Sequence, residues 1–397
     1  MLDRRIPDWL RHSPVPGIRG FAILSAVEST ARGILVSVFP ITMYRTFGDA
    51  EKVSEIYFYI GFLSLLISLF TPWLARFIPR RNLYTAAAIG LGAGAALAGM
   101  GGPLLLPAGL TLMTVSTVVV TICFNAYVMD FVERNALGNC ETLRLFYSGA
   151  AWTFGPFLGV WLMGIWAPAP FIVSVLASLL LIGVFWILRL GNGKNITRAR
   201  APTPNPLAYL GRFLAQPRLV AGWIYAVVRS CGWWVYVVYL PIYAVENGFG
   251  DSVGGITLSI TNGFLFIVPL MLRWMRGRVR RAVLVGFSFS GLAFILAAVV
   301  HASPWPALLL LMVGSVFLIL LDMCAGLPFL MAVRPSERTE MSAVYSTFRD
   351  VSGVLTPGVA RVVLLLAPLP AVFAVTGLAL AMSALLARSL HPRLGLK

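Results

Sequence analysis

Apolar runs of helical length alternate with short polar segments along the whole chain. One helix needs about 20 apolar residues to cross the hydrocarbon core of a bilayer, and the runs have that length. The pattern predicts twelve transmembrane helices, at 18–45, 54–76, 83–102, 105–130, 143–166, 169–190, 219–245, 253–275, 282–301, 305–331, 343–366 and 370–388. It lacks the alternating segments of about ten residues that are typical of transmembrane β-barrels. The predicted fold class is therefore an all-α membrane protein.

The twelve runs form two sets of six that repeat each other at a spacing of 201 residues. The matched residues include Pro40 and Pro241, Pro103 and Pro304, Cys123 and Cys324, and Pro156 and Pro357. A polar linker separates the sets, so we predict an N-terminal six-helix bundle at 1–190, a cytoplasmic linker at 191–218 and a C-terminal six-helix bundle at 219–397. Transporters built from two such pseudo-symmetric bundles bind solute near the membrane midplane and alternate its access to either side.

The composition supports a membrane protein, because only 12% of the residues are charged and the mean hydropathy is +0.86. Soluble domains carry about 25% charged residues. Of the 31 Lys and Arg residues, 25 fall in, or within three residues of, the termini and the connections that follow even-numbered runs, and only Arg45 and Lys52 fall at the opposite connections. This bias predicts cytoplasmic termini in an inner membrane of the bacterial type. The net charge of +16 then belongs to cytoplasmic loops, and no nucleic-acid partner is expected.

The sequence lacks motifs for nucleotide or cofactor chemistry. The glycine-rich stretch Gly90–Gly102 has no phosphate-binding lysine, so we expect no enzyme activity, no cofactor and no ATP-driven pumping. Cys123, Cys231, Met323 and Cys324 are soft ligands that would suit Cu(I). Apolar filling is the favoured interpretation of these residues, and no metal site is predicted. We expect a monomer in the lipid bilayer, whose partners are a small-molecule solute and protons.

Two ionisable residues lie one helical turn apart near the middle of the first run. Glu28 and Arg32 are spaced i, i+4, which places them on one helical face. A charged side chain at the bilayer centre costs at least about 2.5 kcal/mol on insertion scales, and it generally faces a cavity or a partner. We predict that Glu28 carries a proton and that both residues contact solute. The alternative is a static pair that only neutralises itself and fixes the packing.

A second group lies in the seventh run, where Arg229 shares a helical face with Tyr225, Trp233 and Tyr236. Arginine binds carboxylate or phosphate through two parallel hydrogen bonds, and aromatic rings beside it can stack on a solute or hold a cation. Asp322 in the tenth run lies toward the cytoplasmic half. We predict solute contact for all five residues and proton coupling for Asp322. The alternative is an aromatic packing face whose arginine pairs with Asp322 or with the acid of the first run.

Further charged residues lie in the eleventh run and at the end of the fourth. We predict proton coupling for Asp350 and gating roles for Arg349 and Arg361, with interhelical ion pairing as the alternative for the eleventh run. Asp130 lies at the cytoplasmic end of the fourth run, where we predict a salt bridge of the cytoplasmic gate.

Two short motifs resemble those of the major facilitator superfamily. The family's connection between its second and third spans has the form G-x-L-a-D-r-x-G-r-R. Residues 72–81 read PWLARFIPRR, which keeps the leucine and the two final arginines but replaces the aspartate by arginine and both glycines by proline. The glycine–proline pair at 155–156 is similar to the family's antiporter motif, although the motif's last glycine is missing. The resemblance covers essentially the whole chain and implies the family's twelve-helix fold. It also implies gating roles for Arg76, Arg80, Arg81, Gly155 and Pro156.

The charged residues and the resemblance together predict a secondary active transporter. Away from the ends of the predicted helices, three acids nearly balance four bases, which favours a weak acid, a zwitterion or an amphipathic metabolite or drug over a strongly charged ion. Transport would proceed by alternating access with proton coupling. One alternative is uptake of an organic anion or metal chelate by proton symport, and metal-ion transport is less favoured. An alternative of another class is a transporter-derived membrane assembly or receptor protein that moves nothing.

Overall fold

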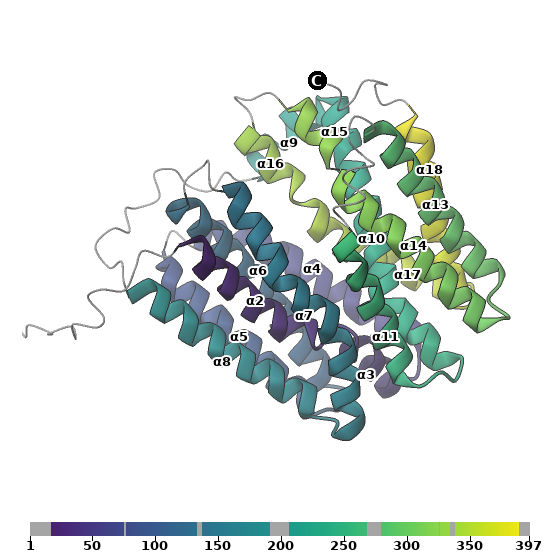
Figure 1. The fold of residues 1–397 in the computed structure, drawn as a ribbon, viewed down its shortest axis with the longest axis horizontal. Helices are drawn as coiled ribbons and strands as arrows, with labels where there is room; N and C mark the ends of the chain where they lie inside the picture. Colours follow the sequence, from purple (N-terminus) through teal and green to yellow (C-terminus); the bar gives the residue numbers. More distant parts are fainter. Residues whose placement is uncertain are drawn as a thin grey trace, which may run out of the picture. The chain divides into compact units, whose positions relative to one another are not determined.

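The computed structural model of the protein describes residues 17–74, 77–132, 137–190, 206–267, 279–324, 326–333 and 338–388. Helices are the only regular secondary structure in these ranges (Figure 1). The first half contains α2 (Ile18–Gly33), α3 (Val38–Phe47), α4 (Ala50–Leu74), α5 (Arg80–Gly99), α6 (Leu105–Phe131), α7 (Leu137–Ile165) and α8 (Ala169–Leu190).

The second half begins with a short helix, α9 (Pro206–Leu214), inside the predicted linker. It continues with α10 (Pro217–Glu246), α11 (Asp251–Gly263), the 3-10 helix η1 (Phe264–Ile267), α13 (Val279–Val299), α14 (Pro304–Cys324), α15 (Leu327–Ala332), α16 (Arg338–Tyr345), α17 (Phe348–Leu364) and α18 (Pro370–Ala387). Every predicted apolar run therefore contains a described helix. Seven helices in the described ranges are long and apolar enough to cross a membrane, counting Ile18–Phe47 as one. The predicted number of twelve stays a prediction.

Three predicted helices are interrupted. The first breaks between α2 and α3, where Pro40 lacks the amide hydrogen that would bond to the carbonyl of Val36. The tenth breaks before α15, which has Pro328 in its first turn. The eleventh breaks between α16 and α17, where the Thr347 hydroxyl donates to the Val344 carbonyl oxygen at 2.7 Å. A side chain that bonds to its own backbone in this way competes with regular helix hydrogen bonding.

The chain divides into two compact units. The first comprises Met1–Val36 and Phe70–Thr203, and the second comprises Ser37–Leu69 and Pro204–Lys397. The boundary that we predict between the two six-helix bundles stays a prediction, because residues 37–69, which belong to the first two predicted spans, fall in the second unit.

Both units pair their helices in the same way. In the first unit α2 packs against α7 and α8, while α5 packs against α6 and α8. In the second unit α10 packs against α17 and α18, while α13 packs against α14 and α18. These pairs occupy equivalent places in the two halves of the sequence, as expected for an internal repeat.

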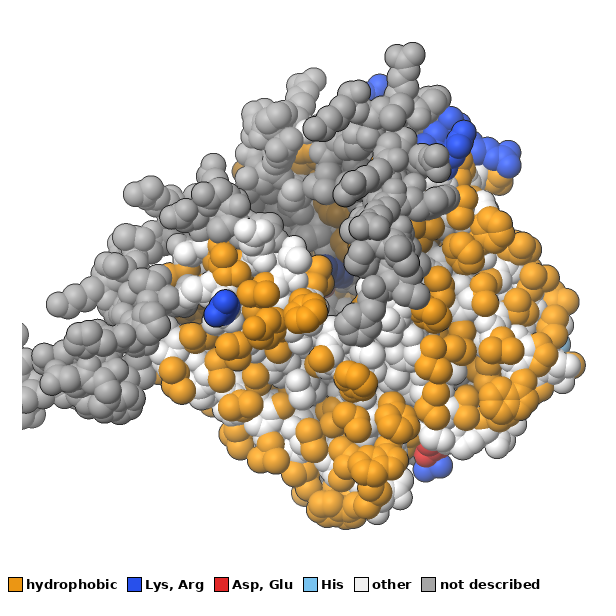
Figure 2. All heavy atoms as spheres, in the orientation of Figure 1, with side chains coloured by type: hydrophobic (Ala, Val, Ile, Leu, Met, Phe, Trp, Pro, Cys, Tyr) orange, Lys and Arg blue, Asp and Glu red, His pale blue; other side chains and the backbone are white. Residues whose placement is uncertain are grey.

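Small residues allow the closest of these helix pairs. A Cβ atom added to Gly155 of α7 would lie 2.7 Å from the backbone of Gly33 in α2, and one added to Gly94 of α5 would lie 2.7 Å from the Gly109 carbonyl oxygen in α6. Such contacts between small residues bring membrane helices together by packing, because lipid supplies no hydrophobic driving force between them. The outward faces carry large apolar side chains (Figure 2), as a bilayer requires.

The two ends of the second unit differ. At one end, connections predicted to be external surround a polar cavity of about 550 Å³, whose lining includes Tyr44, Asp49, Glu246 and His301. At the other end, the short helices α9, α15 and α16 pack with the start of α10 around a buried apolar cluster: Phe213, Leu219, Phe329, Val333, Met341 and Val344. The connections at each end thus belong to one predicted side of the membrane.

Candidate functional site

The second unit contains a buried ion pair between α10 and α14. Arg229 Nε lies 3.0 Å from Asp322 Oδ1, and Trp233 Nε1 donates a hydrogen bond to Asp322 Oδ2 at 2.9 Å. Arg229 and Trp233 are four residues apart on α10, so both reach the same carboxylate from one helical face. Arg229 is only 9% exposed, whereas the Asp322 side chain is 32% exposed. Asp322 is therefore held by one ion pair and one hydrogen bond, and part of its side chain remains accessible.

A second guanidinium group acts on the same carboxylate. The Phe348 ring lies 5.2 Å from Arg229 Cζ and 5.5 Å from Arg349 Cζ, distances at which a cation is attracted to an aromatic ring. Arg349 is also close enough to interact electrostatically with Asp322. The Asp322 carboxylate is thus the centre of a group that also contains Arg229, Trp233, Phe348 and Arg349. We call these five residues the α10 cluster.

The two tyrosines of the predicted aromatic face point elsewhere. Tyr225 is fully buried, and its ring centroid lies 5.6 Å from that of Phe287 on α13. Tyr236 is also fully buried and forms a 2.6 Å hydrogen bond with Thr261, which in turn bonds to Ser315 at 2.9 Å. The structure thus brings Trp233 to Asp322 and places both tyrosines in packed interiors. Solute contact by either tyrosine stays a prediction.

In the first unit, Glu28 and Arg32 form the predicted pair. Arg32 Nη1 donates to Glu28 Oε1 at 2.8 Å, and the Arg32 and Glu28 side chains are 34% and 15% exposed. The guanidinium also lies 5.4 Å from the ring centroid of Trp152 on α7. The fully buried Tyr84 on α5 is close enough to interact electrostatically with Glu28, and its hydroxyl has no hydrogen-bond partner among the described residues. The pair remains accessible on the Arg32 side.

The remaining charged residues of the eleventh run hold α17 to other helices of the second unit. Ser68 on α4 donates to Asp350 Oδ2 at 3.0 Å. Arg361 pairs with Glu51 at 3.5 Å and with Glu55 at 3.1 Å, both near the start of α4. These contacts match the interhelical pairing that the sequence analysis gave as the alternative. The contacts of Arg361 also fit a gate at the predicted external end.

A third ion pair lies at the same end of the second unit. Arg45, near the end of α3, lies 2.8 Å from Asp251 at the start of α11. Burial raises the pKa of Asp251 above its usual range, and the Arg45 charge opposes the shift.

The residues implied by the family motifs are placed only in part. Arg80 and Arg81 begin α5, and Gly155 and Pro156 lie on α7 at its close contact with α2. Arg76 and the side chain of Asp130 lie outside the described residues. Their gating roles stay predictions.

The four cysteines are free thiols, with Cys123, Cys140 and Cys324 buried. Within the described ranges, no group of three or more His, Cys, Asp or Glu side chains is arranged to hold a metal ion.

Comparison with known proteins decides the family. Residues 21–357 match the sequence profile of the Major Facilitator Superfamily. The chain belongs to the major facilitator superfamily. It is therefore an integral membrane protein with a transporter fold. No protein of curated function matches its sequence.

Solved structures of the major facilitator superfamily share this fold at low sequence identity. A POT family transporter in complex with 5-aminolevulinic acid is 11% identical with a TM-score of 0.78, over 95% of this chain and 98% of that one. A bacterial homologue of the iron transporter ferroportin, in an inward-facing state, is 15% identical with a TM-score of 0.69, over 94% and 98%. The nucleoside transporter NupG is 14% identical with a TM-score of 0.67, over 94% and 99%. These likenesses show the fold alone.

Sequence reasoning missed the partners that complete these sites. Phe348, Trp152 and Ser68 are ordinary apolar or hydroxyl residues, and nothing in their sequence neighbourhood distinguishes them from packing residues. Glu51 and Glu55 carried a usable signal. They are spaced i, i+4 at a helix end predicted to be external, and Arg361 inside a predicted span requires a carboxylate.

Proposed function

We propose that this member of the superfamily is a proton-coupled secondary active transporter for a small organic solute that carries a carboxylate, as a weak acid, zwitterion or amphipathic metabolite. It would act in an inner membrane, with both termini cytoplasmic. The observation that supports the proposal is the α10 cluster, in which Arg229 and Trp233 hold Asp322 and Arg349 acts on the same carboxylate. A solute carboxylate could replace Asp322 on the Arg229 guanidinium, which binds carboxylates through two parallel hydrogen bonds.

Proton coupling follows from competition for Arg229. Protonation of Asp322 removes its charge and weakens the ion pair, so the guanidinium becomes available to a solute carboxylate. The incoming carboxylate then restores the original net charge of the cluster. Loss of the proton from Asp322 returns Arg229 to its intramolecular partner and releases the solute. One proton and one carboxylate therefore enter and leave the cluster together.

In the first unit, the Glu28–Arg32 pair would be a further group that contacts solute, and the net charge of the pair is zero. Glu28 accepts a hydrogen bond from Arg32 at 2.8 Å, and an ammonium group of a zwitterion would compete for the same oxygen. Trp152 holds the Arg32 guanidinium on its other side. Such competition at the pair would favour a zwitterion, and protonation of Glu28 would release Arg32.

The other charged residues serve as gates in this proposal. Asp350 joins α17 to α4 through Ser68, and Arg361 joins the same helices through two glutamates. Asp350 would also bind a proton as its contact with Ser68 opens. Arg349 couples this gate to the α10 cluster, because it neighbours Asp350 in the chain. The cytoplasmic gate would use Arg76, Arg80, Arg81 and Asp130, with Gly155 and Pro156 at the contact between α2 and α7.

The test uses the full-length protein in proteoliposomes. Uptake of labelled weak acids, zwitterions including 5-aminolevulinic acid, and organic cations is measured under an inward proton gradient and by counterflow. We expect a carboxylate solute to accumulate. Asp322→Asn should abolish accumulation driven by the gradient and retain counterflow, because asparagine mimics the protonated acid. Arg229→Ala should lose both activities.

A matched control is Asp251→Asn, which changes an ion-paired aspartate outside the α10 cluster and should retain both activities. Gradient-driven accumulation by Asp322→Asn at the wild-type level would refute the coupling role. Uptake of organic cations alone would overturn the solute class. Absence of transport for the whole panel, in protein that remains folded, would favour the assembly or receptor alternative.

A further inference from the structure

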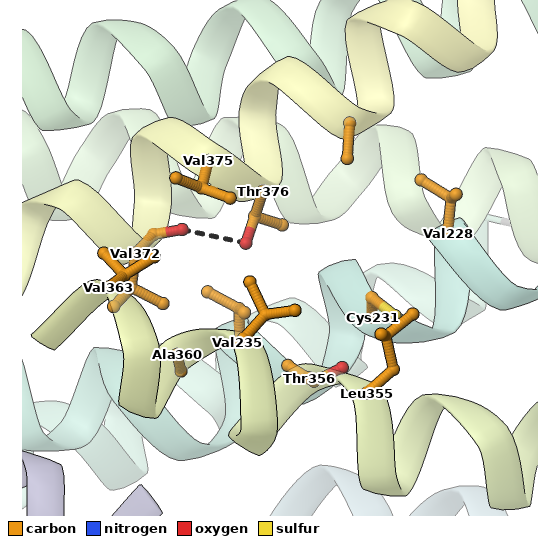
Figure 3. Close-up of a pocket in the computed structure, with 12 residues that line it drawn as sticks. Val228, Cys231, Val235, Leu355, Thr356, Ala360, Val363, Val372, Val375 and Thr376 are labelled. Carbon is orange, nitrogen blue, oxygen red and sulfur yellow. Dashed lines mark hydrogen bonds between the residues drawn. The ribbon is translucent and has the colours of Figure 1, made fainter.

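A second cavity, of about 110 Å³, lies in the second unit between α10, α17 and α18 (Figure 3). α10 forms the floor of the cavity, and α17 and α18 form its walls. Its lining consists of Val228, Cys231, Val235, Leu355, Thr356, Val359, Ala360, Val363, Val372, Val375, Thr376 and Ala379. We call this cavity the acyl groove.

The lining offers a ligand almost only methyl and methylene groups. It contains no charged and no aromatic side chain. The Thr376 hydroxyl donates to the Val372 carbonyl oxygen of its own helix at 2.8 Å (Figure 3). The Cys231 thiol and the Thr356 hydroxyl lie within hydrogen-bonding reach of each other, and the hydroxyl has no stronger partner among the described residues. Water therefore finds few partners in this space.

The groove is open along one side. Its rim residues Leu355, Val359 and Val375 are 46%, 40% and 37% exposed, whereas Val235 and Ala360 inside it are each 1% exposed. The rim continues into the outward face of α18, where Leu378 and Met382 are exposed. Because α18 is one of the helices long and apolar enough to cross a membrane, this rim faces hydrocarbon.

We propose that the groove binds the end of an acyl chain from a bilayer phospholipid. A methyl-lined cavity of about 150 Å³ stays dry and binds benzene, so a space of this size holds an alkyl segment of about four carbons. Valine predominates in the lining, and β-branched side chains have restricted rotamers. The walls are therefore preformed, and binding orders few side chains. Acyl chains are the apolar molecules present in excess at the rim.

The acyl groove is distinct from the α10 cluster. Val228, Cys231 and Val235 follow one another at spacings of three and four residues on one face of α10. Arg229 and Trp233 lie on a roughly opposite face of the helix. A lipid in the groove would touch α10 from behind without reaching the solute contacts. It would fill the space between α17 and α18, and so support α10, which carries Arg229.

The test uses the full-length protein in vesicles of phospholipid that carries a photoreactive diazirine at the end of one acyl chain. After illumination and digestion, mass spectrometry locates the labelled residues. We expect label on the floor of the groove, at Val228–Val235 of α10. Ala379→Leu and Ala360→Leu fill the groove from two different walls and should reduce floor labelling several-fold. Label on the outward face of α18 should persist in both variants.

Ala96→Leu on α5 is the matched control, because Ala96 is exposed on a helix of the other unit. It should leave floor labelling unchanged. An unlabelled floor beside a labelled outer face of α18 would overturn the proposal, as would equal floor labelling in both filling variants.

Discussion

Single residues in the two units differ in how well their buried polar groups are satisfied. Asp322 has an ion-pair partner and a hydrogen-bond donor, whereas the buried hydroxyls of Tyr84 and Tyr225 have no partner among the described residues. A polar group buried without a partner costs about 1–3 kcal/mol. Removing one partner of a buried ion pair costs more, because the other charge is left uncompensated. The energetic effect of a substitution should therefore depend on the partner that the structure assigns to it.

Tyr84→Phe should raise the free energy of unfolding by about 1 kcal/mol, because it removes a buried hydroxyl that has no partner. Tyr236→Phe is the matched control. It removes a hydroxyl that bonds to Thr261 and should lower the free energy of unfolding by about 1 kcal/mol. Thermal unfolding of the purified variants in one detergent measures both. A loss of stability in Tyr84→Phe equal to that of Tyr236→Phe would mean that water occupies the site.

Glu246, after the end of the seventh predicted span, gives a pH-dependent prediction. Burial of its carboxyl group raises the pKa of Glu246, the hydrogen bond from Tyr44 opposes the shift, and Asp49 adds to it. The folded state therefore binds the proton more tightly than the unfolded chain, so stability falls as pH rises through the raised pKa. Glu246→Gln keeps an acceptor for Tyr44 and removes the charge.

The Glu246→Gln variant should unfold at a higher temperature than wild type at pH 8, and the difference should disappear as the pH is lowered toward 4. A pH series of melting temperatures measures this. A difference that grew on acidification would show that the carboxylate stabilises the folded protein.

Individual helices depend on glycines at their closest contacts. In α7, Gly155 faces the backbone of α2, whereas Gly149 and Gly164 of the same helix have open space where a Cβ atom would be. Substitutions in α7 can therefore compare the effect of a close helix contact with the effect of helix propensity alone. Alanine is favoured over glycine in a helix interior by about 1 kcal/mol.

Gly155→Ala should lower the free energy of unfolding by about 1–3 kcal/mol, because its Cβ would lie 2.7 Å from rigid backbone of α2. Gly149→Ala and Gly164→Ala should be neutral or stabilising by up to about 1 kcal/mol. Chemical denaturation in detergent compares the three. Equal effects at all three positions would mean that α2 and α7 separate easily.

Pairing between α4 and α17 can be measured in the same way. Arg361 and Glu55 lie 3.1 Å apart and are each about one-third exposed. Exposed ion pairs typically contribute less than about 1 kcal/mol. A double-mutant cycle with Arg361→Ala and Glu55→Ala should give a small favourable coupling that decreases in high salt. Additive effects would exclude a direct pair.

At the scale of the whole molecule, hydrophobic periodicity predicted the positions of the helices well. Burying apolar runs in lipid leaves the backbone few alternatives to the helix. The breaks near Val36 and Thr347 were not predicted, because short interruptions depend on local backbone bonding that a hydropathy window averages out. The short helix α9 was missed because its nine residues lie in a stretch of polar composition.

The candidate sites were predictable to a different degree. Arg229, Asp322 and the Glu28–Arg32 pair stood out because charges are rare in membrane spans. Their aromatic neighbours could not be predicted, because the sequence shows which side chains share a helical face but not which helix packs against that face. Tyr236 shares the Arg229 face in projection, yet it bonds to Thr261 instead.

The interruption at Ile34–Ser37 coincides with a place where the chain passes from one compact unit to the other, between Val36 and Ser37. The next passage, between Leu69 and Phe70, falls inside the continuous helix α4. The two connections therefore differ in stiffness. At the first, bending breaks fewer backbone hydrogen bonds, because Pro40 has already removed one. The second keeps its helical hydrogen bonds on both sides of the passage. Of these two connections, the first should therefore take up the larger changes in backbone torsion.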